Sequence, residues 1–316
     1  MSSNVRMGNN PIDNVFSKLT LSIAGIFLAI YLPWHIFAIG FRTDHFYFLL
    51  IVTTLFFASS TTRKIVIGFI FFLIYWFIYD AMRIYPNFNF NDIHILEPYN
   101  LEKSLFGIQS TIGQLTPNEY LVQNTNYYSD LASGIFYLTW VPLPIMYCIY
   151  LFFTDKRMLL IFSGTFLLAN IIGFIIYYLY PAAPPWYVAD FGFDVDFTIP
   201  GNAAQLLRFD SIIGYPIFEN MYNKNANVFA AIPSLHSAYP VVLLYFASKK
   251  RKWWLTTLCV VDVIGIWYAA VYSMHHYIID VILGAFCAII AIFAFDLLLK
   301  NIRIKNFVDK YVTFIS

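Results

Sequence analysis

Residues 277–299 read YIIDVILGAFCAIIAIFAFDLLL. Asp280 and Asp296 are the only charged residues in this stretch, and aliphatic and aromatic side chains dominate the rest. A helix rises about 1.5 Å per residue, so roughly 20 mostly apolar residues cross the hydrocarbon layer of a membrane. The stretch therefore predicts a membrane-spanning helix.

The composition of the whole chain agrees with this interpretation. Of its 316 residues, 60% are hydrophobic and 20% are aromatic, while only 12% are charged. Soluble domains carry about 25% charged residues. We therefore predict an integral membrane protein, and the net charge of +1 gives no reason to expect a nucleic-acid partner.

Eight segments are apolar enough to be candidate spans. Five of them are long and regular: Leu19–Ile39, Leu131–Phe153, Met158–Tyr180, Trp253–Tyr272 and Tyr277–Leu299. The other three are short or contain polar residues: Phe46–Ser60, Ile65–Tyr85 and Ala231–Ala247. We predict a single all-α domain over residues 1–316, a polytopic transmembrane bundle of about eight spans, with six as the alternative.

The 19 basic residues are distributed unevenly between the predicted loops. With a cytoplasmic amino terminus and eight spans, five of them lie on the far side of the membrane, and the other 14 lie inside. The five are Arg42, Arg83, Lys103, Arg208 and Lys224. Because cytoplasmic loops carry an excess of Lys and Arg, we predict that both termini are cytoplasmic. A bacterial cytoplasmic membrane and a Golgi membrane both satisfy this topology.

Two long segments on the non-cytoplasmic side interrupt the hydrophobic pattern. The mixed composition of residues 86–130 predicts short interfacial helices. Residues 181–230 open with PAAPPWY, whose prolines end the preceding helix and place Trp186 and Tyr187 at the level of the lipid headgroups. We therefore divide the domain into N-terminal spans (1–85), an interfacial segment (86–130), a catalytic core (131–299) and a cytoplasmic tail (300–316).

His276 and Asp280 lie four residues apart at the entrance of the last predicted span. Residues at this spacing share a helix face, so the carboxylate reaches the imidazole if the helix extends to His276. Asp280 would then hold one ring nitrogen as a donor and leave the other as a nucleophile with a lone pair. An acidic residue within a span is costly and by default marks a function or a buried partner.

His236 opens another predicted span on the same side of the membrane, within the motif Pro233-Ser234-Leu235-His236. It is the natural second proton-transfer group. Ser234 and the backbone amides at this helix start offer hydrogen-bond donors to an anionic phosphate. Two histidines and a carboxylate at the starts of two predicted spans together indicate phosphoryl-transfer chemistry.

Other polar residues have simpler interpretations. We expect His275 to pack or cap rather than to catalyse. His35, His45 and His94 are scattered, and no metal-ligand spacing joins them, so no metal and no cofactor are predicted. The three cysteines fall inside predicted spans and indicate no disulfide framework.

These motifs resemble a known family. Pro233-Ser234-Leu235-His236 and the stretch from His276 to Asp280 resemble the second and third signatures of the type 2 phosphatidic acid phosphatase (PAP2) superfamily, whose membrane members use a six-helix core. The inositol phosphorylceramide synthases, the targets of aureobasidin A, are more similar still. That similarity lies in FAAIPSLHS (229–237), HHY (275–277), PPWY (184–187) and IPG (199–201). It covers roughly residues 158–299.

The resemblance implies a membrane phosphotransferase that moves phosphoinositol from phosphatidylinositol to ceramide or a similar lipid alcohol and releases diacylglycerol. It implies that His276 attacks phosphorus and forms a phosphohistidine. His236 would protonate the departing diacylglycerol oxygen and then act as the base for the ceramide hydroxyl. Asp280 would orient His276.

The chain departs from the superfamily pattern at the phosphate clamp. The first signature is absent, and Ala269-Ala270 replaces the Ser-Arg of the third. Because charge stabilisation is a large catalytic term, other residues must bind the phosphate. Our candidates are Ser234, Arg208, Lys103 and Lys224. Trp186 and Tyr187 are candidates for substrate contacts that exclude water.

Two other functions remain open from the residues. A PAP2-type lipid phosphatase acting on phosphatidate or an isoprenoid phosphate would use the same His276, His236 and Asp280, with water as the acceptor. A non-catalytic lipid-binding or transport protein is the alternative from another class. Lipids and the membrane are the expected partners in each case.

Overall fold

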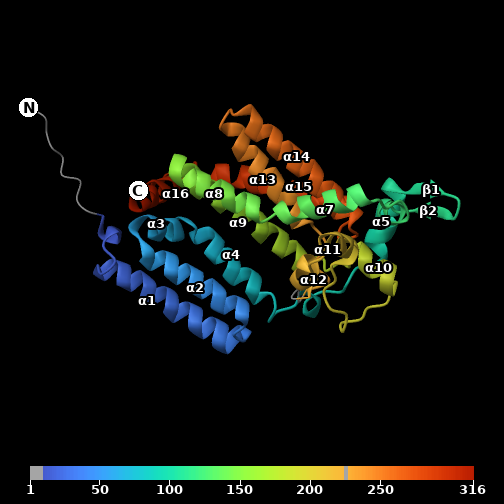
Figure 1. The fold of residues 1–316 in the computed structure, drawn as a ribbon, viewed down its shortest axis with the longest axis horizontal. Helices are drawn as coiled ribbons and strands as arrows, with labels where there is room; N and C mark the ends of the chain where they lie inside the picture. The colour runs from blue at the N-terminus through green and yellow to red at the C-terminus, as the bar shows by residue number, and fades with distance from the viewer. Residues whose placement is uncertain (1–9, 224–226) are drawn as a thin grey trace, which may run out of the picture. The chain divides into compact units, whose positions relative to one another are not determined.

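The computed structural model describes residues 10–223 and 227–316, and helices form almost all of its regular structure (Figure 1). Internal contacts divide the chain into two compact units. The first contains the described residues up to Ile84 together with Ile149–Ser163 and Lys300–Ser316. The second contains Tyr85–Cys148 and Gly164–Leu299. The predicted all-α membrane class is confirmed.

The first unit is built from helices near both ends of the chain. They are η1 (Pro11–Asp13), α1 (Lys18–Pro33) with its π-helical continuation η2 (Trp34–Ile39), α2 (Thr43–Ala58), α3 (Ser60–Gly68), α4 (Ile70–Ala81) and α16 (Ile302–Ile315). The extended backbone of Ser59 ends α2. The Ser59 hydroxyl also caps the start of α3, because it accepts a hydrogen bond from the amide of Thr62. The predicted cytoplasmic tail is thus largely a helix, which buries Val308 and Ile315.

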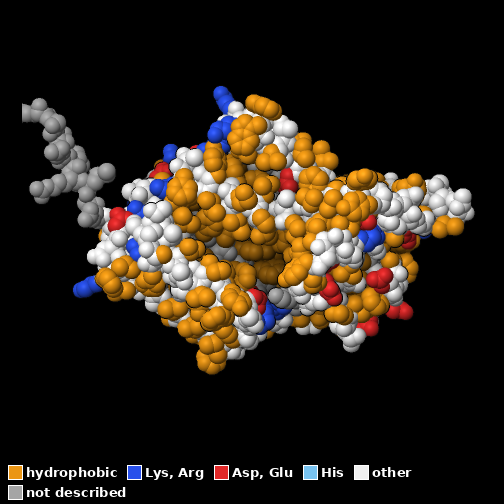
Figure 2. All heavy atoms as spheres, in the orientation of Figure 1, with side chains coloured by type: hydrophobic (Ala, Val, Ile, Leu, Met, Phe, Trp, Pro, Cys, Tyr) orange, Lys and Arg blue, Asp and Glu red, His pale blue; other side chains and the backbone are white. Residues whose placement is uncertain are grey.

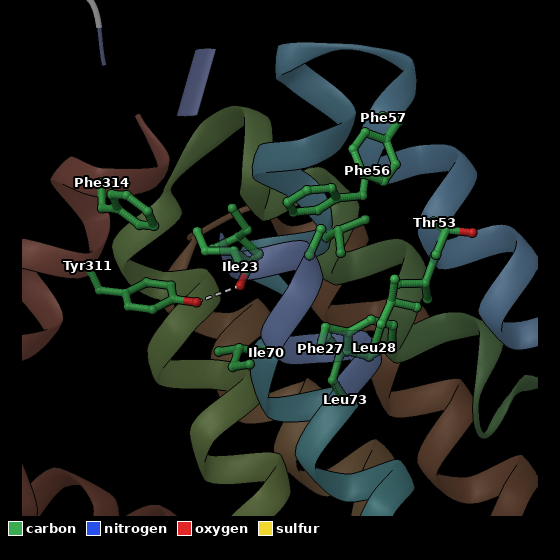
Figure 3. Close-up of a pocket in the computed structure, with 14 residues that line it drawn as sticks. Ile23, Phe27, Leu28, Thr53, Phe56, Phe57, Ile70, Leu73, Tyr311 and Phe314 are labelled. Carbon is green, nitrogen blue, oxygen red and sulfur yellow. Dashed lines mark hydrogen bonds between the residues drawn. The ribbon is translucent and has the colours of Figure 1, made fainter. Parts of the chain in front are cut away.

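An apolar cavity of about 250 Å³ lies within the first unit (Figure 3). Its wall contains two polar side chains, Thr53 and Tyr311. The Thr53 hydroxyl donates to the carbonyl of Leu49, and the Tyr311 hydroxyl donates to the carbonyl of Ile67 at 2.7 Å. Because both hydroxyl protons are already used, the cavity offers an essentially apolar surface.

The second unit contains the longest apolar helices and the segments that cover their ends. Its first part comprises η3 (Asn87–Asn89), α5 (Leu96–Phe106), β1 (Ile108–Ser110), β2 (Gly113–Leu115), α6 (Pro117–Gln123), α7 (Tyr127–Thr139) and α8 (Pro142–Thr154). The rest comprises α9 (Lys156–Leu179), α10 (Pro185–Phe191), η4 (Ala204–Leu206), α11 (Leu207–Ile213), α12 (Ile217–Tyr222), α13 (Leu235–Lys249), α14 (Trp253–Tyr272) and α15 (Ile278–Leu298). The boundary between the units falls within α8 and α9.

Each predicted span coincides with a helix or with a bent helix pair. Within residues 10–223 and 227–316, four helices are long and apolar enough to cross a membrane: α1 with η2, α9, α14 and α15. Two bent pairs, α3 with α4 and α7 with α8, raise the number to six, and α2 is a shorter apolar helix. Helix α13, which coincides with the remaining predicted span, has 15 residues. The total of eight spans stays a prediction.

The structure corrects three details of the predicted elements. The predicted span Leu131–Phe153 bends by 42° between α7 and α8, because Pro142 disfavours helical backbone at the residue before it. The predicted span Ile65–Tyr85 bends by 52° at Phe69. Within residues 86–130, the expected short helices α5 and α6 are joined by an antiparallel hairpin, in which Ile108 pairs with Leu115.

Helix α13 packs against both α14 and α15. Gly284 permits the approach of α15, because a Cβ atom at this position would lie 2.0 Å from the backbone oxygen of Ser234. That oxygen belongs to the residue that caps α13, so it cannot give way as a flexible side chain does. The approach sets the distance between the first turns of α13 and α15.

We expect Gly284→Ala to force α13 and α15 apart and to lower the free energy of unfolding by about 1–3 kcal/mol. Thermal unfolding in detergent measures this change. Gly25→Ala is the matched control, because nothing lies within 4 Å of a Cβ atom at Gly25. Equal stability of the two variants would contradict the steric argument.

Candidate active site

Ser234 connects the beginning of α13 to the beginning of α15. Its hydroxyl caps α13 by accepting a hydrogen bond from the amide of Ser237 at 3.3 Å. Its own amide donates to the carbonyl of Asp280 at 2.9 Å. The Ser234 side chain is fully buried, so the predicted phosphate donor serves here as a helix cap.

The structure brings the two histidines of the separate motifs into contact. Nδ1 of His236 lies 3.2 Å from Nε2 of His276. The Tyr137 hydroxyl, on α7, lies 3.2 Å from the same Nδ1 atom. Sequence analysis did not identify Tyr137, because nothing near it in the sequence indicates that α7 packs against this pair.

A backbone carbonyl determines the tautomer of His276. Nδ1 of His276 lies 3.0 Å from the carbonyl oxygen of Ala231, which can only accept, so this nitrogen carries the proton. Nε2 is then left with its lone pair, and His236 donates to it through Nδ1. The neighbouring His275 points its Nε2 at the carbonyl of Ala203, at 3.1 Å.

Asp280 lies close to His276 but not on the same helical face. Helix α15 begins at Ile278, so the condition for a shared helix face, that the helix extends to His276, is not met. The carboxylate oxygen Oδ2 of Asp280 nonetheless lies 3.6 Å from Nδ1 of His276, and it accepts a hydrogen bond from the amide of Tyr277 at 2.8 Å. Asp280 therefore holds the turn between the two residues as well as facing the ring.

Burial favours the neutral form of the histidines in this turn. His276 is 5% exposed, and desolvation lowers its pKa to about 4, although the carbonyl of Ala231 opposes the shift. Burial also lowers the pKa of His275 well below its usual value. A neutral His276 at pH 7 has the lone pair that a nucleophile needs.

A small cavity of about 60 Å³ opens over the histidines. His236, His275 and His276 line it, and Trp186 forms part of its wall. Gly201 and Asn202 line this cavity and also a second recess of about 210 Å³. Glu219 and Asn223 also line the second recess.

Two of the three predicted phosphate-binding cations, Arg208 and Lys103, do not line this cavity. Arg208 donates through Nε to Asp130 at 2.6 Å, and its guanidinium lies over the ring of Tyr272. Lys103 bonds the hydroxyl of Tyr99 at 3.2 Å. Lys224 lies outside the described residues. Among residues 10–223 and 227–316, no lysine or arginine lines the cavity over the histidines.

The two aromatic residues after the PP pair are buried in the second unit. Trp186 is 4% exposed and Tyr187 is fully buried, so both rings pack inside this unit, and their predicted place at headgroup level stays a prediction. The Tyr187 hydroxyl donates to the carbonyl of Asp194 and accepts from the amide of Asp196, each at 2.8 Å. Tyr187 thus braces a loop, whereas Trp186 lines the cavity.

His35 and His45, predicted to be scattered, come together around Asp80 in the first unit. The amide of Arg42 donates to Nδ1 of His45, so the neutral ring carries its proton on Nε2, which lies 2.8 Å from Oδ2 of Asp80. The guanidinium groups of Arg42 and Arg83 contact Oδ1 at 3.2 and 3.1 Å. A protonated His45 nitrogen and two neighbouring cations favour an ion cluster over a metal site.

Comparison with known proteins agrees with this architecture. The PAP2 superfamily profile matches residues 114–294, which is more than half of the chain. The chain therefore belongs to the PAP2 superfamily. The matched region contains α13, α14 and the histidines at the ends of α13 and α15.

Among the relatives, the phosphoinositol dihydroceramide synthase of Bacteroides thetaiotaomicron is 44% identical over 302 residues, covering 95% of this chain and 99% of the relative. The inositol phosphorylceramide synthase catalytic subunit of Saccharomyces cerevisiae is 30% identical over 118 residues, or 37% of this chain and 29% of the relative. The inositol phosphorylceramide synthase of Candida albicans is 27% identical over 175 residues, 51% of this chain and 36% of the relative. The predicted resemblance is confirmed. No solved structure matches the chain.

The depressed pKa of His276 predicts how stability depends on pH. Between about pH 4 and pH 6.5 the unfolded chain binds a proton at this residue and the folded chain does not, so stability falls as the pH falls through this window. We expect His276→Gln to reduce the slope by up to about 1.4 kcal/mol per pH unit. Unfolding measured in detergent from pH 7 to pH 4 provides the test, and equal slopes for both proteins would contradict it.

Proposed function

We propose that this protein transfers phosphoinositol from phosphatidylinositol to ceramide or a similar lipid alcohol and releases diacylglycerol. The observation that carries the proposal is the contact between His236 and His276 at the mouths of two apolar helices. The nearly full-length similarity to a phosphoinositol dihydroceramide synthase supports this substrate class over a simple phosphatase.

In the first half-reaction, Nε2 of His276 attacks the phosphorus of the phosphodiester. The bond between phosphorus and the diacylglycerol oxygen breaks, and protonated His236 donates its proton to that oxygen. The products are diacylglycerol and a phosphoinositol group bound to His276. Because the facing nitrogens of the two rings are 3.2 Å apart, they separate when the phosphate enters.

In the second half-reaction, neutral His236 removes the proton from the hydroxyl of the lipid alcohol. The resulting oxygen nucleophile attacks phosphorus, the bond to His276 breaks, and the new phosphodiester leaves. The protonation states of both histidines return to those at the start. The carbonyl of Ala231, and the carboxylate of Asp280 at 3.6 Å, stabilise the proton on Nδ1 of His276 throughout.

The transferring group brings negative charge into a cavity whose described lining has no lysine or arginine. We propose that backbone amides at the start of α13 donate to the phosphate oxygens, since a helix start combines free N–H groups with a favourable dipole. The anionic phosphate in turn favours the protonated form of His236. The inositol ring would extend past Gly201 and Asn202 into the second recess.

Transfer to a lipid alcohol requires that water is kept from the phosphohistidine. Trp186 is buried and forms one wall of the cavity over His236 and His276. We propose that this ring, rather than that of Tyr187, limits the access of water to phosphorus.

Reconstituted enzyme tests the reaction with phosphatidylinositol labelled in the headgroup, with and without ceramide. We expect label to enter a new lipid only when ceramide is present. His276→Ala should reduce this transfer by roughly 10⁴-fold or more, because it removes the nucleophile. His236→Ala should reduce it by roughly 10²–10⁴-fold, because it removes the acid and base.

His94→Ala is the control for these variants, because His94 also lies in the second unit but its ring stacks on Tyr180. Water-soluble inositol phosphate released without ceramide would identify a hydrolase instead. If wild-type enzyme turned over neither phosphatidylinositol nor another lipid phosphate, the non-catalytic alternative would replace this proposal.

We further propose that both termini are cytoplasmic and that the histidine site faces the periplasm or an organelle lumen. The unequal distribution of basic residues between the predicted loops supports this orientation. Helix α13 ends in the basic run Lys249–Lys252, whereas the site lies at its opposite end.

Labelling of single introduced cysteines tests the orientation. Ser104 and Ser248 are exposed and lie at the two predicted faces, while the native cysteines Cys148, Cys259 and Cys287 are buried. We expect a membrane-impermeant thiol reagent to label Ser104→Cys in intact cells and Ser248→Cys only after permeabilisation. The reverse pattern would place the site in the cytoplasm.

A further inference from the structure

The turn that carries His275 and His276 is held from outside the PAP2 signatures. It joins α14 to α15 and contains Met274, whose φ of 66° is unusual for a side chain of this size. The amides of His275 and His276 both donate to the carbonyl of Ala270, at 3.2 and 3.0 Å. The carbonyl of Ala270 is thus the hydrogen-bond partner of the amides of His275 and His276, but the first amides of α15 need other acceptors.

Glu102, on α5, satisfies the first free amides of α15. Its Oε1 atom accepts a hydrogen bond from the amide of Ile278 at 3.0 Å, and its Oε2 atom accepts one from Ile279 at 3.1 Å. The carboxylate is fully buried, where an unpaired charge would be costly. Both of its oxygens are therefore committed to the backbone two and three residues after His276.

Asn118, on α6, holds the carbonyl side of the same turn. Its Nδ2 atom donates to the carbonyl of Val271 at 2.8 Å and to the carbonyl of His276 at 2.9 Å. The side chain is fully buried. One amide group thus ties the end of α14 to the backbone of the proposed nucleophile.

The two short helices that present these residues are linked to each other. The Thr116 hydroxyl caps α6, and the carboxylate of Glu119 bonds back to the amide of Thr116 at 2.7 Å. The other oxygen of Glu119 accepts a hydrogen bond from the hydroxyl of Tyr99, on α5, at 3.0 Å. The helices that carry Glu102 and Asn118 are therefore joined by a hydrogen bond between their side chains.

We propose that Glu102 and Asn118 are positioning residues for catalysis, which set the backbone from His276 to Asp280 and thereby aim Nε2 of His276 at phosphorus. Asn118 fixes the carbonyl of His276, and Glu102 fixes the next two free amides, so the peptide is held on both sides. Neither side chain is among the residues that line the cavity over the histidines. They act through the histidine and not on the substrate.

The assignment explains why polar residues lie buried behind the turn. Apolar side chains could fill the same space, but they would leave the amides of Ile278 and Ile279 and the carbonyl of His276 without these partners, whereas the carbonyl of Val271 also accepts from the amide of Met274. Burial raises the pKa of Glu102 to about 7, while the two backbone donors oppose this shift. The charged form, which accepts both hydrogen bonds, also interacts favourably with the positive end of α15.

The test compares steady-state kinetics of full-length variants, each normalised to monodisperse, folded protein in detergent. For Glu102→Gln and Asn118→Ala we expect kcat to fall about 10- to 100-fold, because a misplacement near 1 Å at the reacting atoms costs about this much. We expect the KM for phosphatidylinositol to change less than twofold. Glu102→Ala should lose more activity than Glu102→Gln, which keeps one acceptor oxygen.

Matched controls lie on α5 and directly after α6. Glu97→Gln makes the same chemical change on α5 at an exposed residue, and Asn124→Ala changes an exposed asparagine just after α6. Both should keep wild-type kcat. If Glu102→Gln and Asn118→Ala keep wild-type kcat per folded molecule, or raise KM alone, the positioning role is refuted, even if their thermal stability falls.

This inference rests on the proposed function, and the experiment separates the two. Absence of phosphoinositol transfer by the wild-type enzyme would refute the function. If the wild-type enzyme transfers phosphoinositol and both Glu102→Gln and Asn118→Ala keep its kcat, only the positioning role of these two residues is refuted.

Discussion

The approach of α15 to the start of α13 is the constraint on which the proposed site depends. The amide of Ser234 donates to the carbonyl of Asp280, and Gly284 leaves room for the backbone oxygen of Ser234 one turn further along. This contact places His236 beside His276, although forty residues separate them in the sequence. The same approach leaves Ser234 buried as a cap, so the proposed phosphate donors are backbone amides rather than its hydroxyl.

Burial then sets the electrostatic character of the site. Desolvation lowers the pKa of His276 and so keeps the ring neutral, and the carbonyl of Ala231 holds its proton on Nδ1, so Nε2 has a nucleophilic lone pair without a neighbouring cation. The described lining of the cavity is equally free of lysine and arginine. The negative charge of the substrate is therefore an active component of the proposed mechanism, because it favours the protonated His236 that the leaving group requires.

The sequence predicted the apolar helices well and their ends less well. The span Trp253–Tyr272 matches α14 at both ends, since its boundaries are set by a basic loop and by a polar turn. The spacing of His276 and Asp280 predicted that they would be close if the helix extended to His276, yet their proximity comes from a turn that the carboxylate of Asp280 itself holds. Arg208 had a plausible motif context, but its partner Asp130 lies 78 residues away and is visible only in the fold.

By itself, the sequence determined that this is a helical membrane protein with two histidine motifs of the PAP2 type, because apolar length and local motifs are properties of contiguous residues. Tertiary structure alone decided which carbonyl orients His276, that Trp186 and not Tyr187 lines the cavity, and that Glu102 and Asn118 hold the turn behind the histidines. Each of these depends on a hydrogen bond or contact between segments far apart in the chain. Such pairs leave no periodicity or spacing in a single sequence, since only packing determines which buried polar groups meet.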